Sequence, residues 1–216
     1  HDAHYNVTTV DPPELVQFIR KEYPEAWAAR NKPALTMWEL IPKKRRPPSR
    51  TVRYCCQYFK EGGGERRFVV TGVRHAESAK RAKRKIVETC SQHKGKQYIH
   101  PIIDWSTVEV WEYIRTYHVP YCKLYDEGFK RLGCIMCPYK NSAAMQRDVK
   151  RWPQYAKAYE KAFQRMVDKR RADGYPVNPG WETGADVMRW WLGQGKRSEA
   201  DGQISLFGLR LDETDT

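Results

Sequence analysis

The feature that most constrains this fold is a repeated order in which an apolar extended segment is followed by a helical one. The expected strands are short and rich in β-branched or aromatic residues, and they lie at 3–10, 66–73 and 98–105. The expected helices lie at 11–30, 51–61, 77–90 and 106–118. This order predicts an α/β, Rossmann-like protein in which helices cover a parallel sheet and loops at the strand ends form the ligand site.

Local signals support several of these elements. Asp11 and the two prolines after it suit the first turn of the helix at 11–30. Ser106 and Glu109 have the spacing of a capping box at the start of 106–118. The segment 66–73 is apolar enough to be a buried strand of a parallel sheet.

The sequence becomes helical after Cys137. A long amphipathic helix is expected at 152–174 and a shorter one at 184–195. The apolar positions of the long helix are Tyr155, Ala158, Tyr159, Ala162, Phe163 and Met166. The chain is therefore expected to contain an α/β nucleotide-binding domain over 1–140, a helical region over 141–195, and a polar, mobile tail over 196–216, in which Ile204–Leu209 is apolar enough to dock on the body.

Composition narrows the class of protein. The chain has no run of about 18 apolar residues and no signal-peptide pattern at its start. We therefore expect a cytoplasmic location and no membrane association. The formal net charge is +13, and basic residues concentrate at Pro42–Arg53 and Lys80–Lys85. Such runs attract the phosphates of a nucleotide or a nucleic acid, or else form a solvated basic face.

The cysteines suggest metal ligands rather than a disulfide framework, because no export signal accompanies them. Cys55 and Cys56 are adjacent, and Cys134 and Cys137 form a CxxC pair, so four thiolates are available to one site. Four thiolates suit tetrahedral zinc or an iron–sulfur cluster, and spacing alone does not choose between them. Cys90 follows the basic run and is expected to be a buried or idle thiol.

Four segments, in order, resemble the sulfonucleotide (APS/PAPS) reductase family. They are "CCQYFK", "VTGVRHAESAKR", "PIIDWSTVEVWEYI" and "VPYCKLYDEGFKRLGCIMCP". The resemblance covers residues 3 to 140 and implies the adenine nucleotide alpha hydrolase-like fold of the ATP pyrophosphatase superfamily. It also implies relatives in phage genomes and in DNA phosphorothioation.

The resemblance implies a set of metal ligands. Assimilatory APS reductases hold a [4Fe–4S] cluster with their CC and CxxC pairs, which correspond here to Cys55, Cys56, Cys134 and Cys137. Cys122 stands where the family pattern usually has asparagine, and it is an alternative to Cys55 as the fourth ligand. Zinc at the same thiolates is the alternative to the cluster.

The resemblance also implies a site for an adenine nucleotide, whether ATP, APS or PAPS. Lys60, Arg74 and Arg81 match positions that hold the phosphate or sulfate of the nucleotide. Thr9 and Asp11 match a strand-end segment near the nucleotide. Arg131 and Lys140, which flank the CxxC pair, are expected to be counter-ions to a cluster or a nucleotide.

Two family features are absent from the given sequence. The SGGxDS phosphate loop does not occur, and a longer natural N-terminus is the favoured explanation. The cysteine-containing C-terminal segment that supplies the reductase nucleophile does not occur either, so no catalytic residue is assigned.

The sequence leaves several functions open. The leading hypothesis is an iron–sulfur enzyme that acts on an adenine nucleotide in sulfur metabolism. It would either reduce a sulfonucleotide with a thioredoxin-like reductant or carry out ATP-dependent sulfur transfer, for which the positive charge suits a nucleic-acid acceptor. The alternatives are a zinc-stabilised nucleic-acid-binding module and a non-catalytic partner subunit; a homo-oligomer is compatible with each.

Overall fold

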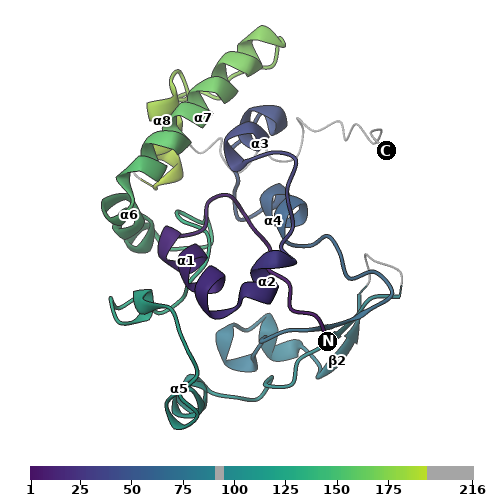
Figure 1. Cartoon of the computed structure of the whole chain (residues 1–216). Coiled ribbons are helices and arrows are strands. Elements are labelled where there is room, and N and C mark those ends of the chain that lie inside the picture. Colours follow the sequence, from purple (N-terminus) through teal and green to yellow (C-terminus); the bar gives the residue numbers. More distant parts are fainter. Residues whose placement is uncertain (91–94, 194–216) are drawn as a thin grey trace. The chain divides into compact units, whose positions relative to one another are not determined.

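A computed structural model describes residues 1–90 and 95–193 of the chain (Figure 1). The described residues form two compact units, each built from separate stretches of the sequence. Unit 1 contains His1–Asn6, Pro13–Asn31 and Cys56–Leu132, and unit 2 contains Val7–Pro12, Lys32–Cys55 and the described residues from Gly133 to Gly193. These units differ from the division at residue 140 expected from the sequence. The tail expected at 196–216 lies outside the described residues.

Unit 1 contains a small mixed sheet. Its strands are β1 (Phe68–Val70), β2 (Val87–Thr89) and β3 (Gln97–Ile99), in the spatial order β1-β3-β2. β1 runs parallel to β3, as the predicted strand–helix order requires, and β2 runs antiparallel to β3. Phe68 and Val70 are 67% and 66% exposed, so β1 is not the buried strand that its apolar sequence predicts.

The helix predicted at 77–90 is wrong. This stretch begins at the last residue of a single-turn 3-10 helix, η1 (His75–Glu77), and contains a second one, η2 (Arg81–Lys83), and then strand β2. Two physical causes account for the difference. The cations of Lys80–Lys85 would repel one another across successive helical turns, and the β-branched residues of Val87–Thr89 favour an extended backbone.

The strand predicted at 3–10 is also wrong, since these residues pair with no strand in the described structure. Thr9 has a left-handed backbone with φ of 63°, which a ladder does not tolerate. The preceding Thr8 N–H donates to the Asp11 carboxylate at 2.8 Å rather than to a neighbouring strand. A local turn therefore replaces the expected strand end.

Three further helices belong to unit 1. The helix predicted at 11–30 is divided into α1 (Pro13–Glu22) and α2 (Pro24–Ala28), because Pro24 cannot continue the first helix. The helix α5 (Thr107–Thr116) confirms the prediction from the capping box: Ser106 Oγ accepts from Glu109 N at 3.2 Å, and Glu109 accepts from Ser106 N at 2.6 Å. A 3-10 turn, η3 (Lys123–Tyr125), follows it.

Unit 2 is helical. Its helices are α3 (Met37–Lys44), α6 (Ser142–Arg151), α7 (Pro153–Ala172) and α8 (Gly184–Trp191). The short helix α4 (Tyr54–Phe59) confirms the helix predicted ahead of the glycine run, and the boundary between the units falls within it. The predicted apolar face of α7 is also confirmed, because Tyr159, Ala162, Phe163 and Met166 are all buried. No helix in the described part of the chain is both long enough and apolar enough to cross a membrane.

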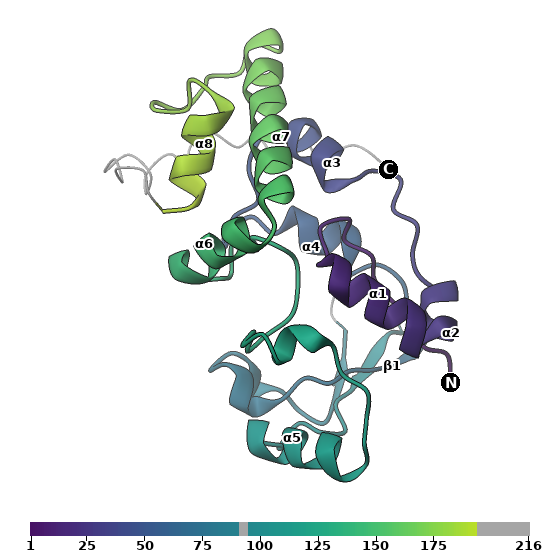
Figure 2. The same cartoon turned by 60° about the vertical axis from the view of Figure 1, so that its left-hand side comes forward.

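Helices α7 and α8 lie side by side (Figure 2), and a glycine permits the contact. A Cβ atom at Gly184 would stand 2.4 Å from the Glu160 carbonyl oxygen and 2.6 Å from the Gln164 amide nitrogen. The Gly184 N–H instead donates to the Gln164 side chain at 2.7 Å. Only glycine allows the start of α8 to approach the α7 backbone this closely.

We therefore expect Gly184→Ala to lower the free energy of unfolding by about 2 kcal/mol, because one of the two helix backbones must shift. Urea denaturation followed by circular dichroism measures the change. Gly62→Ala is the matched control, since a Cβ there meets no atom within 4 Å. Equal midpoints for the two variants would contradict the proposed close approach.

Candidate functional site

The CxxC pair forms a tightly held turn in unit 2. Cys134 and Cys137 are half-buried, whereas Ile135 and Met136 between them are fully buried. Met136 adopts a left-handed backbone with φ of 55°, which costs about 1 kcal/mol for a residue other than glycine. This conformation persists only where surrounding contacts stabilise it.

Those contacts are hydrogen bonds to the backbone between the two cysteines. Ile135 N donates to the Val10 carbonyl at 2.8 Å, and the Ile135 carbonyl accepts from the Tyr159 hydroxyl at 3.3 Å. Met136 N donates to the Asp148 carboxylate at 2.7 Å. The turn is thus held by one bond to residues before α1 and by two from helices α6 and α7.

A buried polar chain reaches the first thiol. The Cys134 sulfur lies 3.5 Å from the Thr8 hydroxyl oxygen, and that hydroxyl donates to Asp11 at 2.7 Å. Thr8 and Asp11 are both buried, so the carboxylate orients the hydroxyl beside the sulfur. Asp11, expected near a nucleotide, lies in unit 2 and is linked to Cys134 through two hydrogen bonds by way of Thr8. The Thr9 hydroxyl accepts from Met37 N at 2.8 Å, at the start of α3.

Three of the thiols affect the pKa of the Tyr159 hydroxyl. Complete burial raises the pKa of its hydroxyl well above the ordinary value, and the charges of Cys134, Cys137 and Cys55 raise this pKa further. The hydroxyl therefore keeps its proton and acts as a donor. Three of the four thiols expected to bind metal thus act electrostatically on one hydroxyl group of unit 2, whereas the fourth, Cys56, belongs to unit 1.

The structure does not assemble a finished metal site. Across residues 1–90 and 95–193, no group of three or more His, Cys, Asp or Glu side chains is close enough to hold a metal ion. The donor atoms near Tyr159 are soft thiols, which suit zinc or iron–sulfur chemistry. The metal ligands predicted from the sequence therefore stay a prediction.

The other two cysteines have different surroundings. Cys122 is buried at the start of η3 in unit 1, and burial is the main cause that raises the pKa of its thiol. Glu14 and Glu127 raise this pKa further. The Cys90 N–H donates to the Lys96 carbonyl at 2.9 Å, next to the end of β2.

In unit 1 the positive charges of Arg74, Arg84 and Arg131 act on Arg81, and we call these four residues the arginine cluster. Burial lowers the pKa of Arg81, and the positive charges of the three other members lower it further. Arg81 pairs with Glu77 and Arg84 with Glu88. Neither Arg74 nor Arg131 forms an ion pair with another described residue.

The members of the cluster are held in different ways. The Arg74 guanidinium donates to the Trp105 carbonyl at 3.2 Å and to the Thr107 hydroxyl at 3.4 Å, which fixes it at the start of α5. Arg131 is exposed. Arg74 and Arg131 both lower the pKa of Tyr125, although burial is the larger effect and raises that pKa. A fixed and an exposed guanidinium that act on the same group can together bind an anion.

The sequence therefore predicted part of this cluster. Arg74 and Arg81 were expected at an anion site, and the charge of Arg74 contributes to the lowered pKa of Arg81; their role at an anion site stays a prediction. Arg131, expected as a counter-ion to a cluster or a nucleotide, lies in unit 1, and its charge acts on Arg81. Lys60 is exposed directly after α4, where its N–H donates to the Cys56 carbonyl at 2.8 Å.

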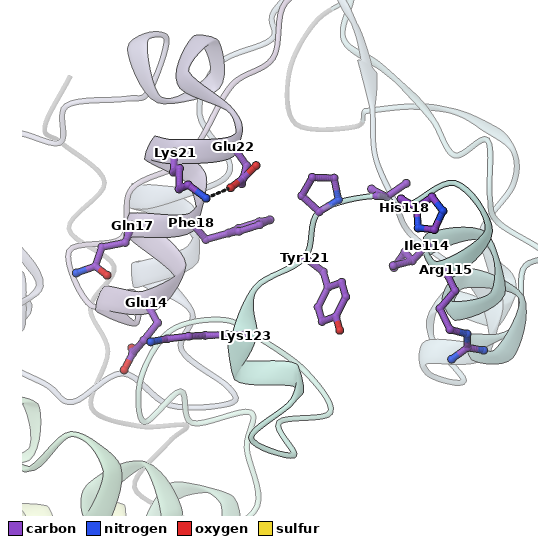
Figure 3. Close-up of a pocket in the computed structure, with 12 residues that line it drawn as sticks. Glu14, Gln17, Phe18, Lys21, Glu22, Ile114, Arg115, His118, Tyr121 and Lys123 are labelled. Carbon is purple, nitrogen blue, oxygen red and sulfur yellow. Dashed lines mark ion pairs between the residues drawn. The ribbon is translucent and has the colours of Figure 1, made fainter.

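A separate pocket lies in unit 1 between α1 and the segment that follows α5 (Figure 3). Its volume is about 800 Å³, and its lining includes Glu14, Phe18, Lys21, Arg115 and Tyr121. Figure 3 shows Phe18 pointing from α1 toward the segment that carries Tyr121. None of the residues predicted to bind metal or nucleotide lines it.

These features define an α/β protein with a cationic cluster in one unit and a thiol-bearing turn in the other. Residues 5–140 match the phosphoadenosine phosphosulfate reductase domain. The chain therefore belongs to this family, whose fold is the adenine nucleotide alpha hydrolase-like α/β fold. The match ends just after the CxxC turn, so helices α6, α7 and α8 lie beyond it.

Individual relatives are distant. An adenosine 5'-phosphosulfate reductase of Oceanobacillus iheyensis is 28% identical over 162 residues, which cover 70% of this chain and 63% of the relative. Another, from Staphylococcus epidermidis, is 29% identical over 143 residues, which cover 63% and 56%. An uncharacterized protein of Methanocaldococcus jannaschii is 28% identical over 153 residues, which cover 67% and 31%. The chain thus spans between 31% and 63% of the length of these relatives.

The different surroundings of the thiols predict different reactivity. We expect Cys122 to react with iodoacetamide at pH 8 about tenfold more slowly than Cys137, because its thiol is buried and its pKa is raised. Mass spectrometry of tryptic peptides after timed alkylation measures both rates in one sample. Equal rates at a temperature well below unfolding would contradict the buried position of Cys122.

Proposed function

We propose that this chain is part of an enzyme of sulfur metabolism that reduces an adenine sulfonucleotide, either APS or PAPS. The observation that carries the proposal is the arginine cluster, which lies within the stretch matched by the phosphoadenosine phosphosulfate reductase domain. Adenosine 5'-phosphosulfate reductases among the relatives support the same class of substrate.

The chemistry of the cluster suits such a substrate. A phosphosulfate carries two adjacent anionic groups, and a guanidinium presents two parallel N–H donors to each. Arg74 is oriented by Trp105 and Thr107, and Arg81 by Glu77, so neither needs to be ordered when the anion binds. Lys60, also in unit 1, would add a point charge. Thr9 and Asp11 stay a prediction from the sequence. The same cations would stabilise the phosphate that leaves when the sulfur is attacked.

We further propose that Cys55, Cys56, Cys134 and Cys137 hold a [4Fe–4S] cluster, with Cys122 as the alternative fourth ligand. The common electrostatic effect of three of these thiols on Tyr159 supports this set over one that includes Cys90. Burial raises the pKa of the Cys122 thiol, which makes it the weaker candidate. When bound, an iron–sulfur cluster supplies a redox-active and polarising centre. The reducing equivalents for turnover would come from a thioredoxin-like protein.

Substitution tests the anion site. We expect Arg74→Ala and Arg81→Ala each to weaken the binding of adenosine 5'-phosphosulfate by about tenfold to a hundredfold, because each removes a charge-assisted pair of hydrogen bonds. Isothermal titration calorimetry measures the affinities. Arg115→Ala, on α5 but outside the arginine cluster, is the control and should bind as the unaltered chain does.

Binding of the sulfonucleotide no tighter than binding of adenosine would refute the proposed substrate. Sulfite release from APS and from PAPS, with thioredoxin as reductant, then separates the two substrates. Turnover that requires ATP and a nucleic acid instead would favour sulfur transfer.

The metal is tested by colour and composition. We expect protein purified without oxygen to be brown, with an absorbance band at about 400 nm and iron and acid-labile sulfide in equal amounts. Cys134→Ser should lose the band, whereas Cys90→Ser should keep it. A colourless protein that contains zinc would show that the thiolates serve a structural site.

A further inference from the structure

Two of the hydrogen bonds that stabilise the turn between Cys134 and Cys137 come from residues beyond the part of the chain that matches the family. Asp148 lies on α6 and Tyr159 on α7, and both helices follow residue 140. Each contributes one hydrogen bond to the backbone between the two cysteines. The two bonds meet consecutive residues, Ile135 and Met136, which are fully buried.

Asp148 is a fully buried carboxylate that accepts from a backbone N–H and from an ammonium group. One of its oxygens accepts from Met136 N at 2.7 Å and also from the ammonium group of Lys140. A buried carboxylate is tolerated only when it is paired in this way. Its other oxygen has no hydrogen-bond partner within the described parts of the chain. Lys140, expected to face a cluster or nucleotide, is thus directed at Asp148.

The bond from Asp148 supports an unusual backbone. Met136 has a positive φ, and its N–H points at the carboxylate. Without this acceptor, the N–H would be buried and unsatisfied, and the turn would gain by relaxing toward an ordinary conformation. Since both cysteines flank this residue, relaxation would change the separation of their sulfur atoms.

Tyr159 supports the preceding peptide from a rigid position. Its ring lies 4.9 Å from that of Trp38 and 4.7 Å from that of Trp191, measured between centroids. Packing on both sides fixes the hydroxyl, which donates to the Ile135 carbonyl. The hydroxyl is therefore placed by the core of unit 2 rather than by the turn.

We propose that Asp148 and Tyr159 are positioning residues, which hold Cys134 and Cys137 in the arrangement needed for both thiolates to bind one metal centre. The proposal rests on the proposed function only in taking these two cysteines as ligands. Helices α6 and α7, which lie beyond the family match, would thus have a role in positioning the two cysteines.

The test compares substitutions in the full chain, with Co²⁺ as the probe metal. We expect Tyr159→Phe and Asp148→Ala each to weaken Co²⁺ binding by about tenfold, the range typical for loss of a group that orients a metal ligand. The thiolate-to-cobalt absorbance band measures the affinity. In metal-free protein, the alkylation rates of Cys134 and Cys137 are measured in parallel and should rise at least severalfold in both variants.

Two controls separate positioning from stability. Tyr155 is one turn earlier on α7, and its hydroxyl also donates to a backbone carbonyl, that of Asp11, at 3.4 Å. Tyr155→Phe should therefore lose similar stability but keep its Co²⁺ affinity and alkylation rates within about twofold. Asp148→Asn keeps a carbonyl acceptor for Met136 N and should restore most of the affinity lost in Asp148→Ala.

The outcomes are distinguishable. If Tyr159→Phe matches Tyr155→Phe in Co²⁺ affinity and in alkylation rates, the positioning role is overturned. If the unaltered chain binds no Co²⁺ but Tyr159→Phe still accelerates alkylation of both cysteines, the positioning role stands and the proposed metal centre fails. If Asp148→Ala does not fold, Tyr159→Phe decides alone.

Discussion

Unit 2 depends on the packing of one side chain, Tyr159, in the middle of α7. Its ring fills the core between α3 and α8 through Trp38 and Trp191, and its hydroxyl reaches the turn between the cysteines. Burial of an aromatic ring of this size stabilises a fold by about 2 kcal/mol. A hydrogen bond from the same residue then transmits the rigidity of the helical core to the thiols. The stability of the helices and the geometry of the site are therefore coupled at one position.

Elements stabilised by contacts between residues close in the sequence were predicted correctly, and elements that depend on other contacts were not. Helices α5 and α7 were predicted correctly because a capping box and a helical period are local signals. The segment at 77–90 was predicted incorrectly, because strand β2 forms only through pairing with β3, which follows it in the chain. The strand expected at 3–10 failed for a related reason: Asp11 offers the Thr8 backbone a local partner that no periodicity reveals.

The candidate site divides in the same way. The motifs predicted Cys134, Cys137, Arg74 and Arg81 as site residues, because the resemblance compares residue types at fixed spacing. Asp148 and Tyr159 belong to no motif and act on the turn from 12 and 24 residues away along the chain. In the sequence, Asp148 is one acid in a basic helix, and Tyr159 is one of several aromatics on an apolar face. Only the three-dimensional structure separates them from their neighbours.

The arginine cluster is the basis for the anion site that we propose in unit 1. Like charges held near one another oppose folding, and here Glu77 and Glu88 compensate two of the four. Arginines that served the fold alone would be expected beside carboxylates or at wider separation. A bound dianion would remove the remaining repulsion and stabilise the unit, by about 2.7 kcal/mol when its concentration is a hundred times its dissociation constant. The repulsion in the absence of ligand would thus become part of the affinity for an anion, and the Trp105 carbonyl and the Thr107 hydroxyl, which accept from Arg74, keep that charge in place.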